Sequence, residues 1–203
     1  MIRLSRMSVL AISVLAVGCS SEALPRTSET SSDTVRQTDS SGVQLPFTTT
    51  HDRRWNPANA GTSYEPCTAM HSERLGVLGW APESVHDAAG TNGQTLRGCV
   101  WTSSDVGSWV VDQVVGNSPS LDAAKKRLPN DGFTEWLEDQ RLRARSVGVL
   151  VYRDGTRCET YVQSRQAGVR TSVTYTGTAT PPIAQVCDRA LAFTRATIDK
   201  MPP

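Results

Sequence analysis

Four cysteines constrain the fold of this chain more than any other feature of its sequence. Cys67, Cys99, Cys158 and Cys187 are separated by gaps of 32, 59 and 29 residues. In an exported protein an even number of cysteines is typical of disulfide bonds, because the compartment is oxidising. A structural zinc site would need closely spaced ligand pairs such as Cys-x-x-Cys, and none is present. We therefore expect two disulfides, for which four cysteines allow three pairings.

Export is predicted by the N-terminus. Arg3 and Arg6 precede an apolar run over residues 7–17. This run has the length of the core of a signal peptide and is too short to span a bilayer. The two arginines are not adjacent, so general secretion is favoured over a twin-arginine signal.

A fifth cysteine, Cys19, directly follows this leader. The sequence Ala16-Val17-Gly18-Cys19 resembles the lipobox of bacterial lipoproteins, in which cleavage occurs before the cysteine and its thiol carries a diacylglycerol group. The lipobox usually has Leu at the position that Ala16 occupies here. We expect a lipoprotein signal peptide over residues 1–18 and a lipid anchor at Cys19 on the extracytoplasmic face of the cell membrane. The alternatives are an ordinary secretory signal or an uncleaved anchor.

The segment after Cys19 reads as a flexible tether. Residues 20–42 are rich in Ser, Thr, Asp and Glu, and cannot bury enough apolar surface to offset the entropy of ordering the chain. The less polar residues 43–47 and Trp55 are candidates for docking on the domain. We predict a tether over residues 19–63 and one domain over residues 64–203.

The pattern of apolar residues predicts an α+β fold, a mainly antiparallel sheet flanked by helices in the order α-β-β-α-β-β-β-α. Segment 133–144 is ambiguous, and a second central helix is one interpretation. The expected helices lie at residues 72–78, 120–128 and 183–201, and the expected strands at residues 98–102, 108–115, 147–152, 157–163 and 169–175.

The last helix selects a disulfide pairing. Val186, Cys187 and Ala190 fall on its apolar face by helical spacing, with Thr180 as a candidate cap. Cys187 then points at the element that the helix covers, and a sheet bearing Cys158 is the natural partner. The favoured pairs are Cys67–Cys99 and Cys158–Cys187.

Several short motifs together resemble those of actinobacterial lipoproteins of unknown function with the DUF3558 domain, among them mycobacterial envelope lipoproteins. The resemblance implies an exported, membrane-anchored domain and supplies no catalytic residues. One departure is that the last cysteine follows Val186, where the family often has proline. The motifs that carry the resemblance are Pro66-Cys67, Ser72-Glu73, Leu78-Gly79, Arg97-Gly98-Cys99-Val100-Trp101, Asp154-Gly155-Thr156-Arg157-Cys158 and Cys187 with its helix.

Candidate catalytic groups are few. His71 and His86 are the candidate bases of the domain, and surface or capping roles are the commoner explanation for each. Glu135, Glu138 and Asp139 would share a face if segment 133–144 were helical, although an exposed face with ion pairs is the commoner case. The sequence has no nucleophile elbow, phosphate loop, dinucleotide fingerprint or calcium loop, so we expect no cofactor and no metal.

Arginine and tryptophan clusters are the candidate binding groups. Arg141, Arg143 and Arg145 could hold an anion, but a solvated face is the commoner explanation. Trp101 and Trp109 could line a ligand site, but burial in the core is the default for such large apolar groups. The formal net charge of +1 argues against a nucleic-acid partner, which requires a basic excess.

The leading hypothesis is a membrane-anchored envelope lipoprotein that binds a partner protein, a lipid or a cell-wall component without catalysis. The membrane itself is a partner through Cys19. A second hypothesis is an envelope hydrolase acting on cell-wall or lipid substrates, with His71 or His86 as base. A third is a regulatory lipoprotein of a membrane signalling protein.

Overall fold

A computed structural model describes residues 35–90, 96–105, 108–128 and 131–203. The chain divides into two units, and all described residues belong to the second, Thr34–Pro203. The signal peptide expected over residues 1–18 and the lipid anchor expected at Cys19 lie outside the described residues, and both stay predictions.

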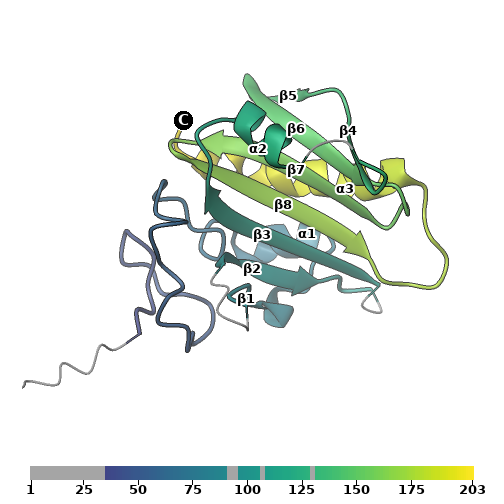
Figure 1. Cartoon of the computed structure of the whole chain (residues 1–203). Helices are drawn as coiled ribbons and strands as arrows, with labels where there is room; N and C mark the ends of the chain where they lie inside the picture. Colours follow the sequence, from purple (N-terminus) through teal and green to yellow (C-terminus); the bar gives the residue numbers. More distant parts are fainter. Residues whose placement is uncertain (1–34, 91–95, 106–107, 129–130) are drawn as a thin grey trace, which may run out of the picture. The chain divides into compact units, whose positions relative to one another are not determined.

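The described residues form an antiparallel sheet of eight strands, in the order β1-β2-β3-β8-β7-β6-β4 with β5 also paired to β6 (Figure 1). They also form three α-helices and two 3₁₀ turns. The strands are β1 His86–Asp87, β2 Arg97–Thr102, β3 Trp109–Asn117, β4 Thr134–Trp136, β5 Gln140–Leu142, β6 Arg145–Tyr152, β7 Arg157–Ser164 and β8 Ala167–Tyr175. The helices are α1 Ser72–Val77, α2 Leu121–Arg127 and α3 Ile183–Thr197, and the turns are η1 Pro82–Ser84 and η2 Ile198–Lys200. The predicted α+β class is confirmed.

Local sequence explains the central hairpin. Between β6 and β7, Gly155 adopts a φ of +75°, which favours glycine because it has no Cβ. Asp154 stabilises the same turn, since its Oδ1 accepts a hydrogen bond from the backbone N–H of Thr156 at 3.0 Å. The Asp-Gly sequence therefore suits the turn that joins these two strands.

Helix α3 covers one face of the sheet, behind β7 and β8 in Figure 1. Its buried residues follow the helical repeat, and Val186 and Ala190 are fully enclosed. Phe193 extends this stripe and packs between Trp80 and Trp101, with ring centroids 6.4 Å and 5.4 Å away. The helix begins at Ile183, later than a cap at Thr180 would place it, and no side chain caps it.

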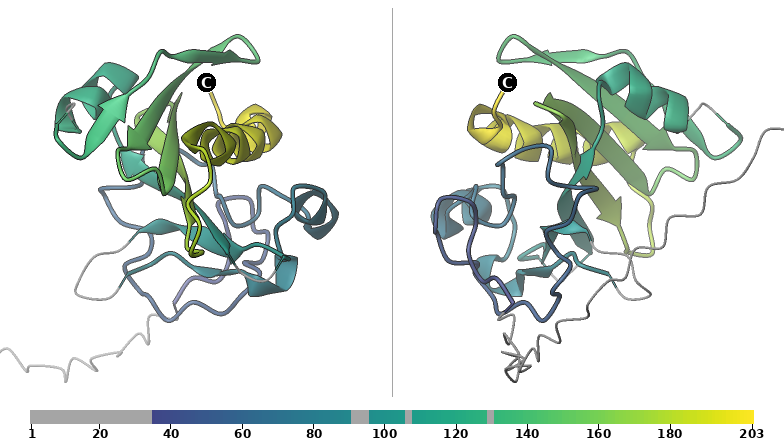
Figure 2. Two further views of the ribbon diagram at one scale, coloured as in Figure 1. Left: turned by 90° about the vertical axis from the view of Figure 1, so that its right-hand side faces the viewer. Right: turned by 60° about the vertical axis from the view of Figure 1, so that its left-hand side comes forward.

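Helix α2 lies on the opposite face, as Figure 2 shows. Ser120 caps it, because its hydroxyl accepts a hydrogen bond from the backbone N–H of Ala123. A Cβ at Gly148 of β6 would lie 2.6 Å from Leu121 and 2.9 Å from Trp136, so this glycine allows α2 to approach the sheet closely. Helix α2 has only seven residues, and it covers β6 and β7 but leaves the ends of β3 and β8 open.

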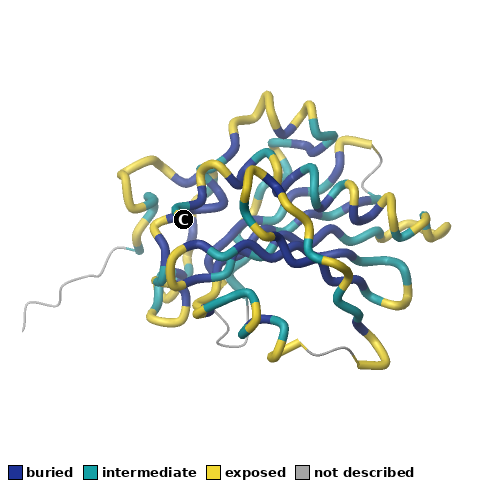
Figure 3. The backbone as a smooth tube through the Cα atoms, turned by 90° about the horizontal axis from the view of Figure 1, so that it is seen from above, coloured by how far each residue is buried: buried dark blue, intermediate teal, exposed yellow. Residues whose placement is uncertain are grey.

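Both predicted disulfides are present. Cys67 pairs with Cys99, and Cys158 pairs with Cys187, with Cα atoms 5.3 Å and 5.1 Å apart. The first links the segment before α1 to β2, and the second fixes α3 to β7. The core lies between the sheet and α3, and Figure 3 shows the buried central strands and the exposed connecting loops.

The helix considered for segment 133–144 is wrong. These residues form β4 and β5, both paired to β6, with Thr134 opposite Tyr152 and Leu142 opposite Arg145. A neighbouring strand with free backbone groups overrides the local helical pattern, because pairing satisfies the N–H and C=O groups of both segments. The short β1 was also missed.

The domain boundary predicted at residue 64 is too late. Leu45 is buried, and the Arg54 side chain is fully enclosed and bound to both carboxylate oxygens of Glu65. Arg97 donates hydrogen bonds to the backbone carbonyls of Asn59, Thr62 and Tyr64. The polar segment 35–63 is therefore part of the domain, and its buried charges are paired rather than solvated.

Candidate functional site

The candidate bases do not form a catalytic arrangement. His71 and His86 are both exposed, and the Nδ1 atom of His86 lies 3.1 Å from the backbone carbonyl of Ser84. Within the part of the chain that the structure describes, neither imidazole bonds to a carboxylate or a serine hydroxyl. Glu135 lies on β4 and pairs with Arg153 at an exposed position, while Asp139 pairs with Lys125.

Two arginines of the cluster, Arg143 and Arg145, and both tryptophans contact other parts of the domain. Arg145 donates hydrogen bonds to the backbone carbonyls of Ile198 and Met201. These bonds connect β6 to η2 and to the residue that follows it. Arg143 forms an exposed ion pair with Asp199. Trp101 and Trp109 are both buried in the core on the α3 face, as favoured from the sequence.

A groove of about 620 Å³ lies on the open face of the sheet, beside α2. Its walls are largely apolar, and two of its rim residues, Leu96 and Leu128, are among the exposed large hydrophobic residues of the described chain. The residues that line it are Ala58, Leu96, Val114, Val115, Gly116, Asn117, Ser118, Ala124, Arg127, Leu128, Tyr161, Gly168 and Arg170.

Two paired glycines create the floor of this groove. Gly116 of β3 lies opposite Gly168 of β8 in the sheet register, so no side chain stands on the open face at that point. A Cβ built at Gly116 would meet no atom within 4 Å. The groove is thus a gap in the layer of side chains, bounded on one side by Ala124 and Leu128.

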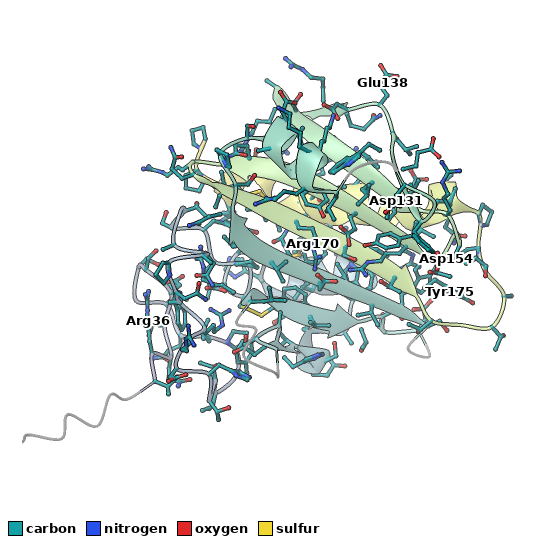
Figure 4. All side chains as sticks on the ribbon, in the orientation of Figure 1. Arg36, Asp131, Glu138, Asp154, Arg170 and Tyr175 are labelled. Atoms are coloured by element: carbon teal, nitrogen blue, oxygen red, sulfur yellow. A yellow bond between two sulfur atoms is a disulfide. The ribbon has the colours of Figure 1, made fainter. Side chains whose placement is uncertain are left out.

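A charged cluster adjoins the glycine floor. The guanidinium of Arg170 donates to Asp112 at 2.9 Å and lies 3.7 Å from Glu159 (Figure 4). The Glu159 carboxylate, whose side chain is 1% exposed, also pairs with Arg157 at 2.9 Å and accepts a hydrogen bond from the Tyr161 hydroxyl at 2.6 Å. These charges come from adjacent strands and compensate one another, as buried charges must.

The match to known families covers the whole of this arrangement. A family model described as "Protein of unknown function (DUF3558)" matches residues 14–200, which include both disulfides, the groove and Cys19. The chain belongs to the DUF3558 family. No curated protein matches it.

Electrostatics limit what the groove of this DUF3558 protein can do. Burial and the nearby Glu159 charge raise the pKa of Tyr161. Burial alone would lower the pKa of Arg170, but the charges of Asp112 and Glu159 outweigh it and raise that pKa. At neutral pH the phenol therefore stays protonated and the guanidinium stays charged. Both act as hydrogen-bond donors rather than as bases.

The described part of this DUF3558 protein contains neither a cluster of metal ligands nor a membrane-spanning helix. Among the described residues, no group of three or more His, Cys, Asp or Glu side chains is placed to hold a metal ion. Within the same residues no helix combines the length and apolar character that crossing a bilayer requires.

Sequence reasoning missed the groove, although a signal for it existed. Gly116 and Gly168 interrupt two runs of strand-forming residues, and glycine inside a strand often marks a close approach of backbone or ligand. The ion pairs between Arg170, Asp112 and Glu159 left no such signal, because their contact depends on the order of β3, β8 and β7 in the sheet.

Proposed function

We propose that this DUF3558 protein is an actinobacterial cell-envelope lipoprotein, anchored through Cys19, whose domain binds a ligand with an apolar body in the groove beside α2 without catalysing a reaction. The observation that carries the proposal is the apolar groove itself, open to solvent and floored by the paired Gly116 and Gly168. The anchor places the domain at the extracytoplasmic face of the membrane, where apolar ligands such as lipids are abundant.

The size and lining of the groove support a ligand site. Its volume of about 620 Å³ falls within the ~300–1,000 Å³ typical of small-molecule pockets. Val114 and Ala124 supply apolar walls inside it, and Leu96 and Leu128 extend the apolar surface to the rim. Covering these side chains removes apolar surface from water, which is the main source of affinity for such a ligand.

The chemistry of the adjoining cluster supports binding over catalysis. Glu159 is enclosed by Arg157, Arg170 and Tyr161, so its carboxylate is already paired. The raised pKa of Tyr161, caused first by burial, keeps its hydroxyl protonated. The protonated Tyr161 hydroxyl donates to Glu159, so it acts as a hydrogen-bond donor rather than as a general base.

Filling the groove tests the ligand site. In the Gly116→Leu variant the new side chain extends into open space, because a Cβ there meets no atom within 4 Å. The test is the binding of a neutral apolar dye, Nile red, to the full chain, followed by fluorescence. Affinity should fall about tenfold, which corresponds to ~1.4 kcal/mol or roughly 55 Å² of apolar contact at ~25 cal/mol per Å².

The matched control is Gly76→Leu. Gly76 is exposed on α1, and a Cβ there also meets nothing within 4 Å, so this variant adds the same side chain far from the groove. Its dye affinity should equal that of the wild type. Equal affinity in the Gly116→Leu variant would refute the groove as the ligand site.

The lipid anchor is tested separately. Cys19→Ala should abolish metabolic labelling with a fatty acid, and unchanged labelling would refute lipidation.

A further inference from the structure

A second cavity lies on the opposite side of the sheet from the groove, where α3 meets the turn after α1. Its volume is about 390 Å³, and Arg189 of α3 contributes its only described cationic side chain. The residues that line it are Val77, Leu78, Gly79, Trp80, Ser104, Asp105, Arg189 and Ala192.

Two indole rings hold the guanidinium of Arg189 in place. Its Cζ atom lies 4.4 Å from the ring centroid of Trp109 and 5.8 Å from that of Trp80. Both tryptophans are buried, so their ring positions are fixed by the core. A guanidinium in such contact is attracted to the negative face of the ring and loses freedom before any ligand arrives. Arg189 is therefore preorganised.

The hydrogen-bond donors of Arg189 make no hydrogen bond to the residues that the structure describes. Among the described residues its guanidinium forms no hydrogen bond and no ion pair, whereas the guanidinium groups of Arg54 and Arg170 are each bound to two carboxylates. Asp105 lines the same cavity but forms no ion pair with Arg189. The donors therefore line the cavity without an acceptor among the described residues.

The backbone of Gly79 borders this space. Gly79 ends the turn after α1 with a φ of +79°, and a Cβ there would lie 3.8 Å from the Nη1 atom of Arg189. The carbonyl of Gly79 is already used by Ser104, whose backbone N–H donates to it at 3.1 Å. The planar fork of Arg189 suits a two-oxygen anion from outside.

We propose that this cavity is an anion-binding site in which Arg189 holds a carboxylate or phosphate group through paired N–H donors. Val77, which is 71% exposed, and Leu78 and Ala192 form an apolar wall for the part of the ligand that carries the anion. The site does not depend on the groove, since α3 and the groove lie on opposite faces of the sheet.

Titration of the full chain with small anions tests the site. Tryptophan fluorescence reports binding, because Trp80 and Trp109 lie beneath the guanidinium. Butyrate and inorganic phosphate are the two probes, each at constant ionic strength, and the tighter of them identifies carboxylate or phosphate as the preferred group. We expect saturable binding of at least one probe, weakened about tenfold or more in Arg189→Ala.

The matched control is Arg195→Ala, which removes an exposed arginine of the same helix. Arg189→Lys keeps the charge but loses the planar fork, so it should bind more weakly than the wild type while folding normally. Asp105→Asn should tighten binding, since it removes the competing negative charge. Absence of saturable binding, or equal weakening by Arg195→Ala, would overturn the proposal.

Discussion

Replacing Arg54 with alanine should destabilise the domain severely. The Arg54 side chain is fully buried and donates to both carboxylate oxygens of Glu65, at 2.8 Å and 2.7 Å, and to Asp87 at 3.0 Å. It also stacks on Trp55, whose ring centroid is 4.5 Å away. This one side chain joins segment 35–63 to the residues that precede α1 and to β1.

The magnitude follows from the partner that the substitution leaves behind. In Arg54→Ala the Glu65 carboxylate, 2% exposed, loses both guanidinium hydrogen bonds and keeps Arg97 at 4.0 Å and the backbone N–H of Cys67 at 3.3 Å. Removing one partner of a buried ion pair costs about 3–5 kcal/mol, because an uncompensated charge stays in the interior. The stability of a whole domain is only about 5–15 kcal/mol. The variant should therefore keep at best a small margin of stability.

Urea unfolding followed by tryptophan fluorescence measures this loss. The control is Arg153→Ala, which breaks the exposed pair with Glu135, whose charged atoms lie 3.3 Å apart, and should cost less than ~1 kcal/mol. The double variant Arg54→Met with Glu65→Leu removes both charges and should recover part of the loss. If Arg54→Ala alone costs less than ~1 kcal/mol, then segment 35–63 does not fold with the domain and the reasoning fails.

Two further predictions concern stability and ionisation. Replacing Cys158 and Cys187 together with alanine should lower the free energy of unfolding by about 3–4 kcal/mol, the chain-entropy value for a separation of 29 residues, as urea unfolding would show; a loss near zero would contradict this. Backbone N–H donors from Phe133 and Thr134 lower the pKa of Asp131 from its ordinary 3.8. Its stabilising effect should be complete above pH ~4 and lost as the pH falls through the lowered pKa. An NMR titration midpoint at or above 3.8 would disprove it.

The elements that could be predicted were those whose sequence pattern alone determines them. The stripe Val186, Cys187 and Ala190 defined the buried face of α3, and the alternation along residues 169–175 defined β8. Because Cys187 had to face the sheet, the disulfide to Cys158 followed from the same pattern. Periodicity reports which face of an element is buried, and a crosslink between two such faces can be inferred from it.

The remaining elements depend on partners that are distant in the sequence. Segment 133–144 became β4 and β5 only because β6 offers free backbone groups on that edge. Segment 35–63 has the composition of a tether, yet its Arg54 forms ion pairs with Glu65 and Asp87. Arg97 of β2 likewise donates a hydrogen bond to the backbone carbonyl of Tyr64, next to this segment. Composition counts polar residues but does not tell whether their hydrogen bonds are made to water or within the protein.

The two faces of the sheet explain why both proposed sites are where they are. On one face, α3 has fifteen residues and is tied to β7 by Cys158–Cys187, and the cavity that Arg189 lines lies beside it. On the other face, α2 has seven residues and ends before it reaches Gly116. Because the ladder between β3 and β8 holds the groove floor, a ligand would meet a preformed surface. Its affinity would then not be reduced by ordering the protein on binding.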